Sequence, residues 1–481
     1  MQGSMLNRRI PRLAPLLAGA VLVLAACGPS PSVTPSAPAS PGSSAFAAST
    51  PISAAAVGAH LEALQTIADA NGGVRTSGTP GYDASVDYVA QRLRDLGYAV
   101  ETPDFEMATF TELPGARIQV GAGGPVFEAG RDFHAMIYSA GADLTATVAE
   151  VGFDEAGRGG CAAADWTDLP DDVIAVVPPG PCFRRQVVLN AVEAGALAVI
   201  VGYPQWPAGE VRRPTLLDPD GMSIPAISAS AELGEALRTA AASGAQVHVS
   251  LDTEIGRATV RNVIAESHAI AQQVVMLGGH LDSVHDGPGI NDNGSGTAAL
   301  LEVARLMADE HPGARIRLAF WGGEEFGLFG SQAYVDALTP EQRGEIGAYL
   351  NFDMLGSPNA VPFVYDQADA ASGSAEITDY LVAYLESVGI GAERTDPGGG
   401  SDHAHFAEAG IPTGGIFSGA SELKSSLQAE AFGGSADEPM DACYHLACDT
   451  VANVDVELVA TFADAAVALT LAIATGELAI R

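Results

Sequence analysis

Positive charge is scarce in this chain. Its 481 residues include 23 lysines and arginines against 59 aspartates and glutamates, so the formal net charge at pH 7 is −36. Lys424 is the one lysine in the sequence. Because phosphate backbones are bound by basic stripes, this balance excludes nucleic acid as an expected partner. The same acidity is a poor match for anionic membrane surfaces, and we interpret it as a solubility feature.

The N-terminal region lacks an apolar run long enough for a comfortable bilayer span. Leu13–Ala26 is apolar but shorter than the roughly 20 residues that a membrane-spanning helix needs. A positive stretch precedes it, with Arg8, Arg9 and Arg12. This combination predicts a targeting segment that is not part of the fold.

The apolar run ends in Leu24-Ala-Ala-Cys27, which resembles a bacterial lipobox. We therefore expect residues 1–27 to be a lipoprotein signal peptide and Cys27 to carry lipid. An ordinary secretory signal cleaved near the alanines is the alternative, and twin-arginine export is a weaker one because the rest of that motif is missing. Residues 28–51 are rich in Pro, Ser and Ala, a composition that cannot bury a core and is typical of a linker.

In the second half of the chain, polar residues directly follow apolar runs. Val274–Leu277 is fully apolar, as expected of a strand buried on both faces of a parallel sheet, and His280 and Asp282 follow it. Asp292 then lies in a turn rich in Gly and Asn, before a stretch of helical periodicity over Thr297–Met307. In open α/β sheets, ligands collect at the carboxyl ends of strands, where these side chains would lie.

The same pattern occurs at two further runs. Ile316–Trp321 is followed by Glu324 and Glu325, and Ala348–Phe352 is followed by Asp353. A lone histidine or acid at such a place is usually a hydrogen-bonded core residue or part of a solvated face. Repeated acids after buried strands are costly to bury, however, unless they are paired or bound to metal. The runs therefore predict one crevice with a metal site.

The candidate ligands are two histidines and three carboxylates, namely His280, Asp292, Glu325, Asp353 and His445. Zinc favours imidazole and carboxylate ligands, and this set can hold two zinc ions. A further carboxylate, Glu324, lies beside the set in the sequence and can move protons. The combination indicates metal-assisted hydrolysis, with peptide bonds as the expected substrate.

These segments resemble the secreted bacterial aminopeptidases of the co-catalytic dizinc type, over roughly Ile52 to the C-terminus. The matching stretches are His280-Leu-Asp-Ser-Val, Pro288-Gly-Ile-Asn-Asp-Asn-Gly-Ser-Gly, Glu324-Glu-Phe-Gly-Leu-Phe-Gly-Ser, Asn351-Phe-Asp-Met-Leu-Gly-Ser, Ser401-Asp-His and Cys443-Tyr-His-Leu-Ala-Cys-Asp. The resemblance implies an α/β fold: a three-layer α/β/α domain with a mixed, mostly parallel sheet.

The resemblance also assigns roles to single residues. His280 and Asp353 would bind one zinc ion, Glu325 and His445 the other, and Asp292 would bridge both. Glu324 would be the general base for a hydroxide that bridges the ions, and Tyr444 would stabilise the oxyanion. Asp282 would fix the imidazole of His280 through its other ring nitrogen.

Two further features accompany this resemblance, one in the backbone and one in the sequence. The family has a cis peptide after the bridging aspartate, here Asp292-Asn293. Many relatives carry an arginine just before the Ser-Asp-His run, near the substrate amine, where this chain has Gly400. If the family uses the carbonyl of that residue, glycine serves. If the family uses the guanidinium of that arginine, this chain must bind its substrate differently, because Gly400 has no side chain.

The chain has five cysteines, and four remain if Cys27 is lipidated. The family pairs Cys443 with Cys448, which would pin Tyr444 and His445 together. Cys161 and Cys182 are then left for each other, and two buried free thiols are the alternative, which is less expected in an oxidising compartment.

The stretch between the two parts of the peptidase-like sequence resembles a protease-associated domain, a small β-rich module. We place the first peptidase part at 52–130, the insert at 131–257 and the second part at 258–481. The insert has no catalytic set of its own. It could cover the cleft, bind substrate or only pack.

We therefore predict a zinc-dependent aminopeptidase that acts on peptide substrates. It would be exported, as an outward-facing lipoprotein anchored by its lipid or as a secreted monomer. The alternatives are a glutaminyl cyclase-like enzyme or a carboxypeptidase on the same fold, and a non-enzymatic binding lipoprotein. Nothing in the sequence supports an added calcium site.

Overall fold

The computed structural model describes residues 51–153, 159–308, 310, 313–367 and 371–480. The predicted signal segment with Cys27 and the linker up to residue 50 lie outside the described residues. The predictions made for them therefore stay predictions.

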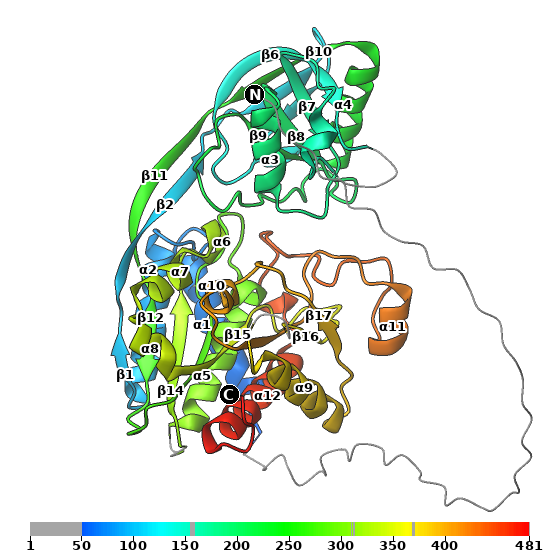
Figure 1. The fold of residues 1–481 in the computed structure, drawn as a ribbon. Coiled ribbons are helices and arrows are strands. Elements are labelled where there is room, and N and C mark those ends of the chain that lie inside the picture. The colour runs from blue at the N-terminus through cyan, green and yellow to red at the C-terminus, as the bar shows by residue number, and fades with distance from the viewer. Residues whose placement is uncertain (1–50, 154–158, 309, 311–312, 368–370, 481) are drawn as a thin grey trace, which may run out of the picture. The chain divides into compact units, whose positions relative to one another are not determined.

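An eight-stranded mixed sheet forms the centre of the larger part of the fold (Figure 1). In spatial order its strands are β1 (Ala99–Glu101), β12 (Val263–Glu266), β14 (Arg315–Trp321), β13 (Val274–His280), β15 (Ile346–Phe352), β18 (Thr413–Phe417), β16 (Phe363–Tyr365) and β17 (Glu393–Thr395). The central strands β14, β13, β15 and β18 run parallel, whereas β12 and β16 pair antiparallel with this group. The expected mixed, mostly parallel sheet is confirmed.

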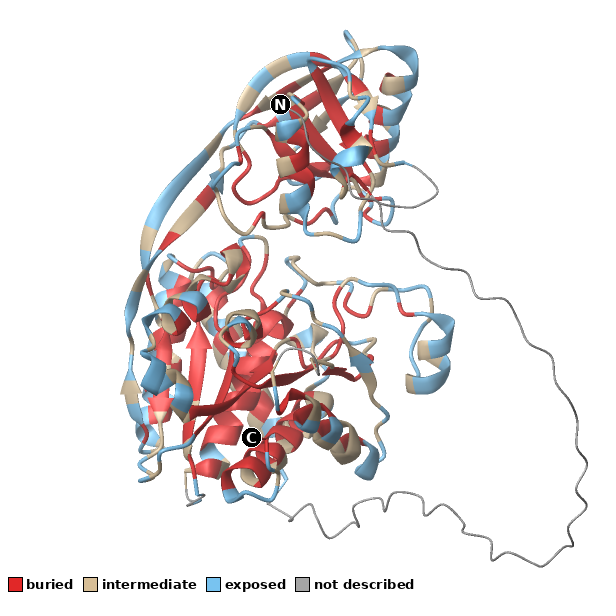
Figure 2. Ribbon diagram, in the orientation of Figure 1, coloured by how far each residue is buried: buried red, intermediate tan, exposed pale blue. Residues whose placement is uncertain are grey.

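Helices cover both faces of this sheet, because its central strands are apolar on both sides. Along β13, Val275 and Leu277 belong to one buried cluster, and Val274 and Met276 belong to another. The first cluster includes residues of α1 (Ala54–Ala70), α2 (Pro80–Asp95), α5 (Gly296–Met307), α9 (Ser374–Ser387) and α12 (Val456–Thr475). The second includes residues next to or in α7 (Phe329–Ala337) and α10 (His403–Glu408), while α8 (Pro340–Glu345) leads into β15. Figure 2 shows the resulting buried centre, and the predicted three-layer α/β/α arrangement is confirmed.

Helix α12 is long and apolar enough to cross a membrane by length and composition. In the structure, 67% of its most apolar window is buried, and it packs against α5 and α1. We therefore assign it to the core of the fold.

A second eight-stranded sheet forms the insert. Its spatial order is β4 (Val126–Glu128), β3 (Arg117–Val120), β10 (Gln246–Leu251), β6 (Ala142–Glu150), β7 (Val173–Val177), β8 (Ala198–Gly202), β9 (Ala226–Ala229) and β5 (Phe133–Ala135). Its helices are η1 (Ala163–Trp166), α3 (Arg184–Glu193) and α4 (Ala231–Ser243). Strands β6 to β9 pair in parallel. The expected disulfide between Cys161 and Cys182 is present next to α3.

A two-stranded antiparallel ribbon connects the two sheets (Figure 1). It consists of β2 (Asp104–Glu112) and β11 (Thr253–Arg261), which follow β1 and precede β12 respectively. The second sheet runs from Arg117 to Leu251, and the domain boundaries placed at 130 and 257 stay predictions.

Candidate metal centre

The site begins at the carboxyl ends of three neighbouring parallel strands. His280 is the last residue of β13, Asp353 follows the last residue of β15, and Glu324 opens the short helix α6 (Glu324–Gly327) just after β14. Since these strands are adjacent in the sheet, their carboxyl ends meet at one edge. The sequence pattern of apolar runs followed by polar residues therefore becomes a cluster in space.

A glycine turn directs both glutamates into this cluster. Gly323 has φ +70°, in the left-handed region that favours glycine, and a Cβ on Gly322 would lie 2.3 Å from the Tyr82 hydroxyl. The turn leads directly into the first turn of α6, so Glu324 and Glu325 lie in a helical segment instead of on opposite faces of a strand. The main-chain N–H of Gly323 donates to the Ser77 hydroxyl at 2.8 Å, which holds the turn.

Asp292 lies in a buried turn, η2 (Ile290–Ser295), that precedes α5, and the backbone of this turn is not helical at Asp292 and Asn293. The expected cis peptide between Asp292 and Asn293 is present. The carboxylate of Asp449 accepts the main-chain N–H of Asn291 at 2.8 Å and that of Asp292 at 3.0 Å. Asp449 thus fixes the backbone that presents the carboxylate of Asp292. The sequence analysis gave it no role, although it ends the Cys443 to Asp449 motif.

The two oxygens of Asp292 face different histidines. Oδ1 lies 3.1 Å from Nε2 of His280, and Oδ2 lies 3.1 Å from Nε2 of His445. The remaining carboxylates divide in the same way: Asp353 Oδ1 is 3.2 Å from the His280 nitrogen, and Glu325 Oε2 is 3.1 Å from the His445 nitrogen. The five residues thus form two groups of three ligand atoms that share one carboxylate.

This spacing fits two zinc ions. Four-coordinate zinc with bonds of about 2.0–2.1 Å places neighbouring ligand atoms about 3.3 Å apart. The ligand pairs at 3.1–3.2 Å are close to that separation. Ligand atoms of His280, Asp292 and Glu325 also lie within 4.8 Å of one another, as do those of His280, Glu324 and Asp353. Glu324 is therefore near enough to act beside the ligands or to join them.

Burial, together with contacts between charged groups, shifts the pKa values of this cluster. Burial raises the pKa of Glu325 to about 7 and raises the pKa of Glu324 well above its usual value. Burial alone would lower the pKa of His445, but Glu325 and Asp292 outweigh it and raise the pKa to about 10. The protein chain thus holds protons here that a bound cation would displace.

The neighbours of His280 and Asp353 orient these two ligands. Nδ1 of His280 lies 3.1 Å from the main-chain oxygen of Asp282 and 3.6 Å from its carboxylate. A proton on Nδ1 would leave Nε2 free to bind metal. The other oxygen of the Asp282 carboxylate accepts the N–H of Gly323 at 3.1 Å, and the role expected of Asp282 in fixing this imidazole stays a prediction. The Ser401 hydroxyl donates to Asp353 Oδ2 at 2.7 Å, which explains the serine of the Ser401-Asp-His run.

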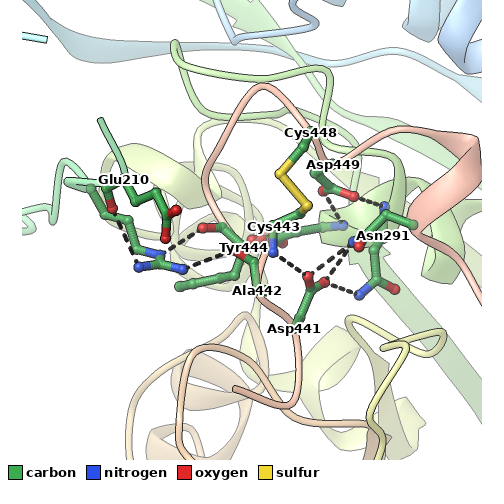
Figure 3. Close-up of a disulfide and its surroundings, with 11 residues drawn as sticks. Glu210, Asn291, Asp441, Ala442, Cys443, Tyr444, Cys448 and Asp449 are labelled. Carbon is green, nitrogen blue, oxygen red and sulfur yellow. Dashed lines mark hydrogen bonds between the residues drawn. A yellow bond between two sulfur atoms is a disulfide. The ribbon is translucent and has the colours of Figure 1, made fainter. Parts of the chain in front are cut away.

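Tyr444 and His445 lie in a disulfide-closed loop before η3 (Val451–Asn453) and after α11 (Ser426–Phe432). The expected Cys443–Cys448 disulfide is present, as Figure 3 shows. The ring of Tyr444 stacks on that of His445 with centroids 3.8 Å apart. The side chains of the predicted ligand, His445, and of the expected oxyanion donor, Tyr444, therefore pack against each other within one disulfide-closed loop.

These residues line a cleft of about 580 Å³. Glu324, Glu325, Tyr444 and His445 border it together with Gly400, and the insert contributes Phe183 and Arg184. The sequence analysis did not assign the two insert residues to the site, since no local pattern marks them. The structure thus brings together every predicted ligand, the predicted base and the predicted oxyanion donor.

Comparison with known proteins agrees with this centre. Residues 262–470 match the model of peptidase family M28, and residues 144–237 match the PA domain. The chain is 41% identical over 424 residues to the probable lipoprotein aminopeptidase LpqL of Mycobacterium tuberculosis, covering 84% of this chain and 81% of that protein. It is 38% identical over 420 residues to an aminopeptidase of Pseudomonas aeruginosa, covering 84% of this chain and 78% of that one.

Solved structures share the fold. An aminopeptidase from Aneurinibacillus sp. strain AM-1 superposes with a TM-score of 0.70 at 25% identity, covering 89% of this chain and 96% of that one. A zinc aminopeptidase from Bacillus subtilis gives 0.67 at 25% identity, covering 88% and 96%. From these matches and the centre described above, the chain belongs to peptidase family M28 and is a metallo-aminopeptidase that carries a PA domain.

Proposed function

We propose that this chain removes N-terminal residues from peptides outside the cytoplasmic membrane, using two zinc ions that share Asp292. The observation that carries the proposal is the division of the Asp292 carboxylate, whose oxygens each lie 3.1 Å from a different histidine. One group would consist of His280, Asp353 and Asp292, and the other of His445, Glu325 and Asp292.

The chemistry divides between the metal and the protein. Bound zinc lowers the pKa of a coordinated water and polarises the scissile carbonyl. Glu324 takes a proton from the attacking water and later donates it to the leaving amine, which its raised pKa favours. Tyr444 donates a hydrogen bond to the oxyanion from its place at the rim of the cleft.

The charge of the cleft supports an amine-bearing substrate end. Beyond the metal-site residues, the lining includes the carboxylates of Glu393, Asp396 and Glu422, whereas Arg184 is the one arginine or lysine among the described lining residues. A free ammonium group is therefore favoured over a free carboxylate near the scissile bond.

The first experiment tests metal content and the substrate end together. Elemental analysis should find two zinc ions per chain, and chelation should abolish hydrolysis of aminoacyl amides until zinc or cobalt is added back. N-acetylated forms of the same amides serve as the control and should not be cleaved. Full activity with no more than one tightly held metal ion, or cleavage of the acetylated control, would refute the proposal.

The location rests on Leu24-Ala-Ala-Cys27 and on the name of the mycobacterial relative, which describes a lipoprotein. We expect Cys27→Ala to move the protein from the membrane fraction to the soluble fraction with unchanged specific activity, because the lipid contributes nothing to the cleft. Fractionation in the native host followed by mass spectrometry measures this. Wild-type protein without lipid on Cys27 would contradict the anchor.

A further inference from the structure

An arginine of the insert reaches the loop that carries Tyr444. Nε of Arg212 donates to the main-chain oxygen of Tyr444 at 2.8 Å, and Nη2 donates to that of Ala442 at 3.1 Å. Figure 3 shows this loop with Ala442, Cys443 and Tyr444 beside the disulfide. These bonds connect two segments more than two hundred residues apart in the sequence.

Arg212 is itself held firmly by the insert. It is 5% exposed, and its guanidinium lies 5.2 Å from the centroid of the Trp206 ring. The Ser228 hydroxyl, on strand β9, donates to the main-chain oxygen of Arg212 at 2.6 Å. Trp206 in turn stacks on Tyr203 with centroids 3.7 Å apart. The guanidinium therefore projects from a fixed part of the insert.

The buried guanidinium of Arg212 depends on main-chain oxygens for its hydrogen bonds. Among the residues that the structure describes, the guanidinium of Arg212 donates its hydrogen bonds to main-chain oxygens, those of Tyr444, Glu210 and Ala442. Burying a guanidinium costs free energy unless its donors are satisfied, so these carbonyls are what make its position tolerable. The contact is thus a specific link and not a by-product of packing.

The carbonyl that accepts from Arg212 lies between two side chains of the candidate site, those of Tyr444 and His445. The oxygen of Tyr444 belongs to the peptide plane that joins Tyr444 to His445. His445 has φ +60°, a left-handed conformation that side-chain-bearing residues adopt only where their surroundings enforce it. Loss of the bonds to Tyr444 and Ala442 would leave the backbone on both sides of Cys443 free to shift, and this stretch carries Tyr444 and His445 at the cleft.

We propose that Arg212 is a positioning residue for the peptidase reaction, through which the insert sets the orientation of the Tyr444–His445 peptide plane. The inference rests on the proposed role of Tyr444 at the oxyanion. It gives the PA domain an indirect part in catalysis, through the loop that carries Tyr444 and His445.

The main experiment is a double-mutant cycle at saturating zinc. Loss of an oxyanion donor typically lowers kcat by about 10²–10³-fold, so Tyr444→Phe should fall in this range. Arg212→Met should lower kcat by about 10–100-fold, because it displaces the donor without removing it, and KM should change little. If Arg212 acts through Tyr444, the double variant should match Tyr444→Phe within about 2-fold.

Arg213→Met is the matched control. Arg213 is the next residue of the same segment, and its Nε donates to the Asp286 carboxylate of the peptidase domain at 3.1 Å. This variant also removes an insert-to-peptidase contact, here an ion pair with a carboxylate instead of hydrogen bonds to main-chain oxygens, and it removes no hydrogen bond to the Tyr444 loop. Its kcat should stay within about 2-fold of wild type. A loss equal to that of Arg212→Met would show that general loosening of the insert is responsible, and would overturn the proposal.

A second measurement does not depend on activity. In metal-free protein, hydrogen exchange of the amides in 443–449 should be faster in Arg212→Met and unchanged in Arg213→Met. Arg212→Lys, which keeps the charge and one donor direction, should fall between wild type and Arg212→Met, and it serves as the test variant if Arg212→Met does not fold.

The outcomes separate this proposal from the proposed function. Unchanged exchange, or effects of Arg212→Met and Tyr444→Phe that multiply, would overturn the positioning role. Faster exchange together with a fully active Tyr444→Phe would keep the positioning of the loop, but it would remove Tyr444 from the mechanism proposed above.

Discussion

Glu324→Gln should lower kcat by about 10²–10⁴-fold while two zinc ions stay bound. Loss of a general base typically has this effect, which corresponds to about 3–5 kcal/mol at about 1.36 kcal/mol per decade. Glutamine keeps the shape of the side chain but cannot accept a proton from water. KM should remain close to wild type, because no ligand and no wall of the cleft is removed. Steady-state kinetics and elemental analysis of the same preparation measure both quantities.

Glu325→Gln is the matched variant, since the two glutamates are adjacent in α6. Glu325 Oε2 lies 3.1 Å from Nε2 of His445, whereas Glu324 groups with His280 and Asp353. Glu325→Gln should therefore weaken one zinc site, with partial recovery of activity at high zinc concentration. If Glu324→Gln loses a zinc ion and Glu325→Gln keeps both, the two assignments are reversed. Near-full turnover of Glu324→Gln would remove it as the base.

The parts of the fold that were predictable are those whose signal is local. The runs at Val274–Leu277, Ile316–Trp321 and Ala348–Phe352 lie in β13, β14 and β15, because strands buried on both faces are mostly apolar. Their polar exceptions are paired: Arg317 with Glu266, and Asn351 with Ser401. The residues that follow these runs form most of the metal centre, since parallel strands present their carboxyl ends at one edge. The gathering of the predicted ligands at one edge of the sheet could therefore be predicted from the sequence, while their roles as ligands stay predictions.

Other parts depend on contacts between distant segments. Most residues of the ribbon strand β11 are exposed, and they lack the alternating apolar pattern that predicts a strand. Asp449 and Arg212 act on residues far away in the chain, through hydrogen bonds to main-chain groups that any residue type would offer. No local pattern encodes such a partner. The turn that brings Glu324 and Glu325 inward has a local signal in Gly322 and Gly323. Asp292 was expected in a Gly- and Asn-rich turn, but the irregular backbone of that turn has no such signal.

Asp292→Ala should remove both zinc ions, whereas Asp353→Ala should remove one. Asp292 contributes a ligand atom to each group of three, and Asp353 contributes to the group of His280 alone. Two zinc ions in this site would repel each other strongly, and Asp292 would place one carboxylate oxygen toward each of them. Elemental analysis after gel filtration should find no more than a trace of zinc in Asp292→Ala and about one ion in Asp353→Ala.

Thermal unfolding gives a readout of the same prediction that is independent of turnover. Zinc that binds only the folded protein raises Tm in proportion to the logarithm of its concentration over Kd. Wild-type protein should show the largest rise, Asp353→Ala a smaller one, and Asp292→Ala almost none at the same zinc concentration. Asp292→Asn keeps the shape and one acceptor oxygen, so it should retain at most one ion. If Asp292→Ala instead holds one zinc ion as tightly as Asp353→Ala does, the carboxylate serves a single metal and does not bridge.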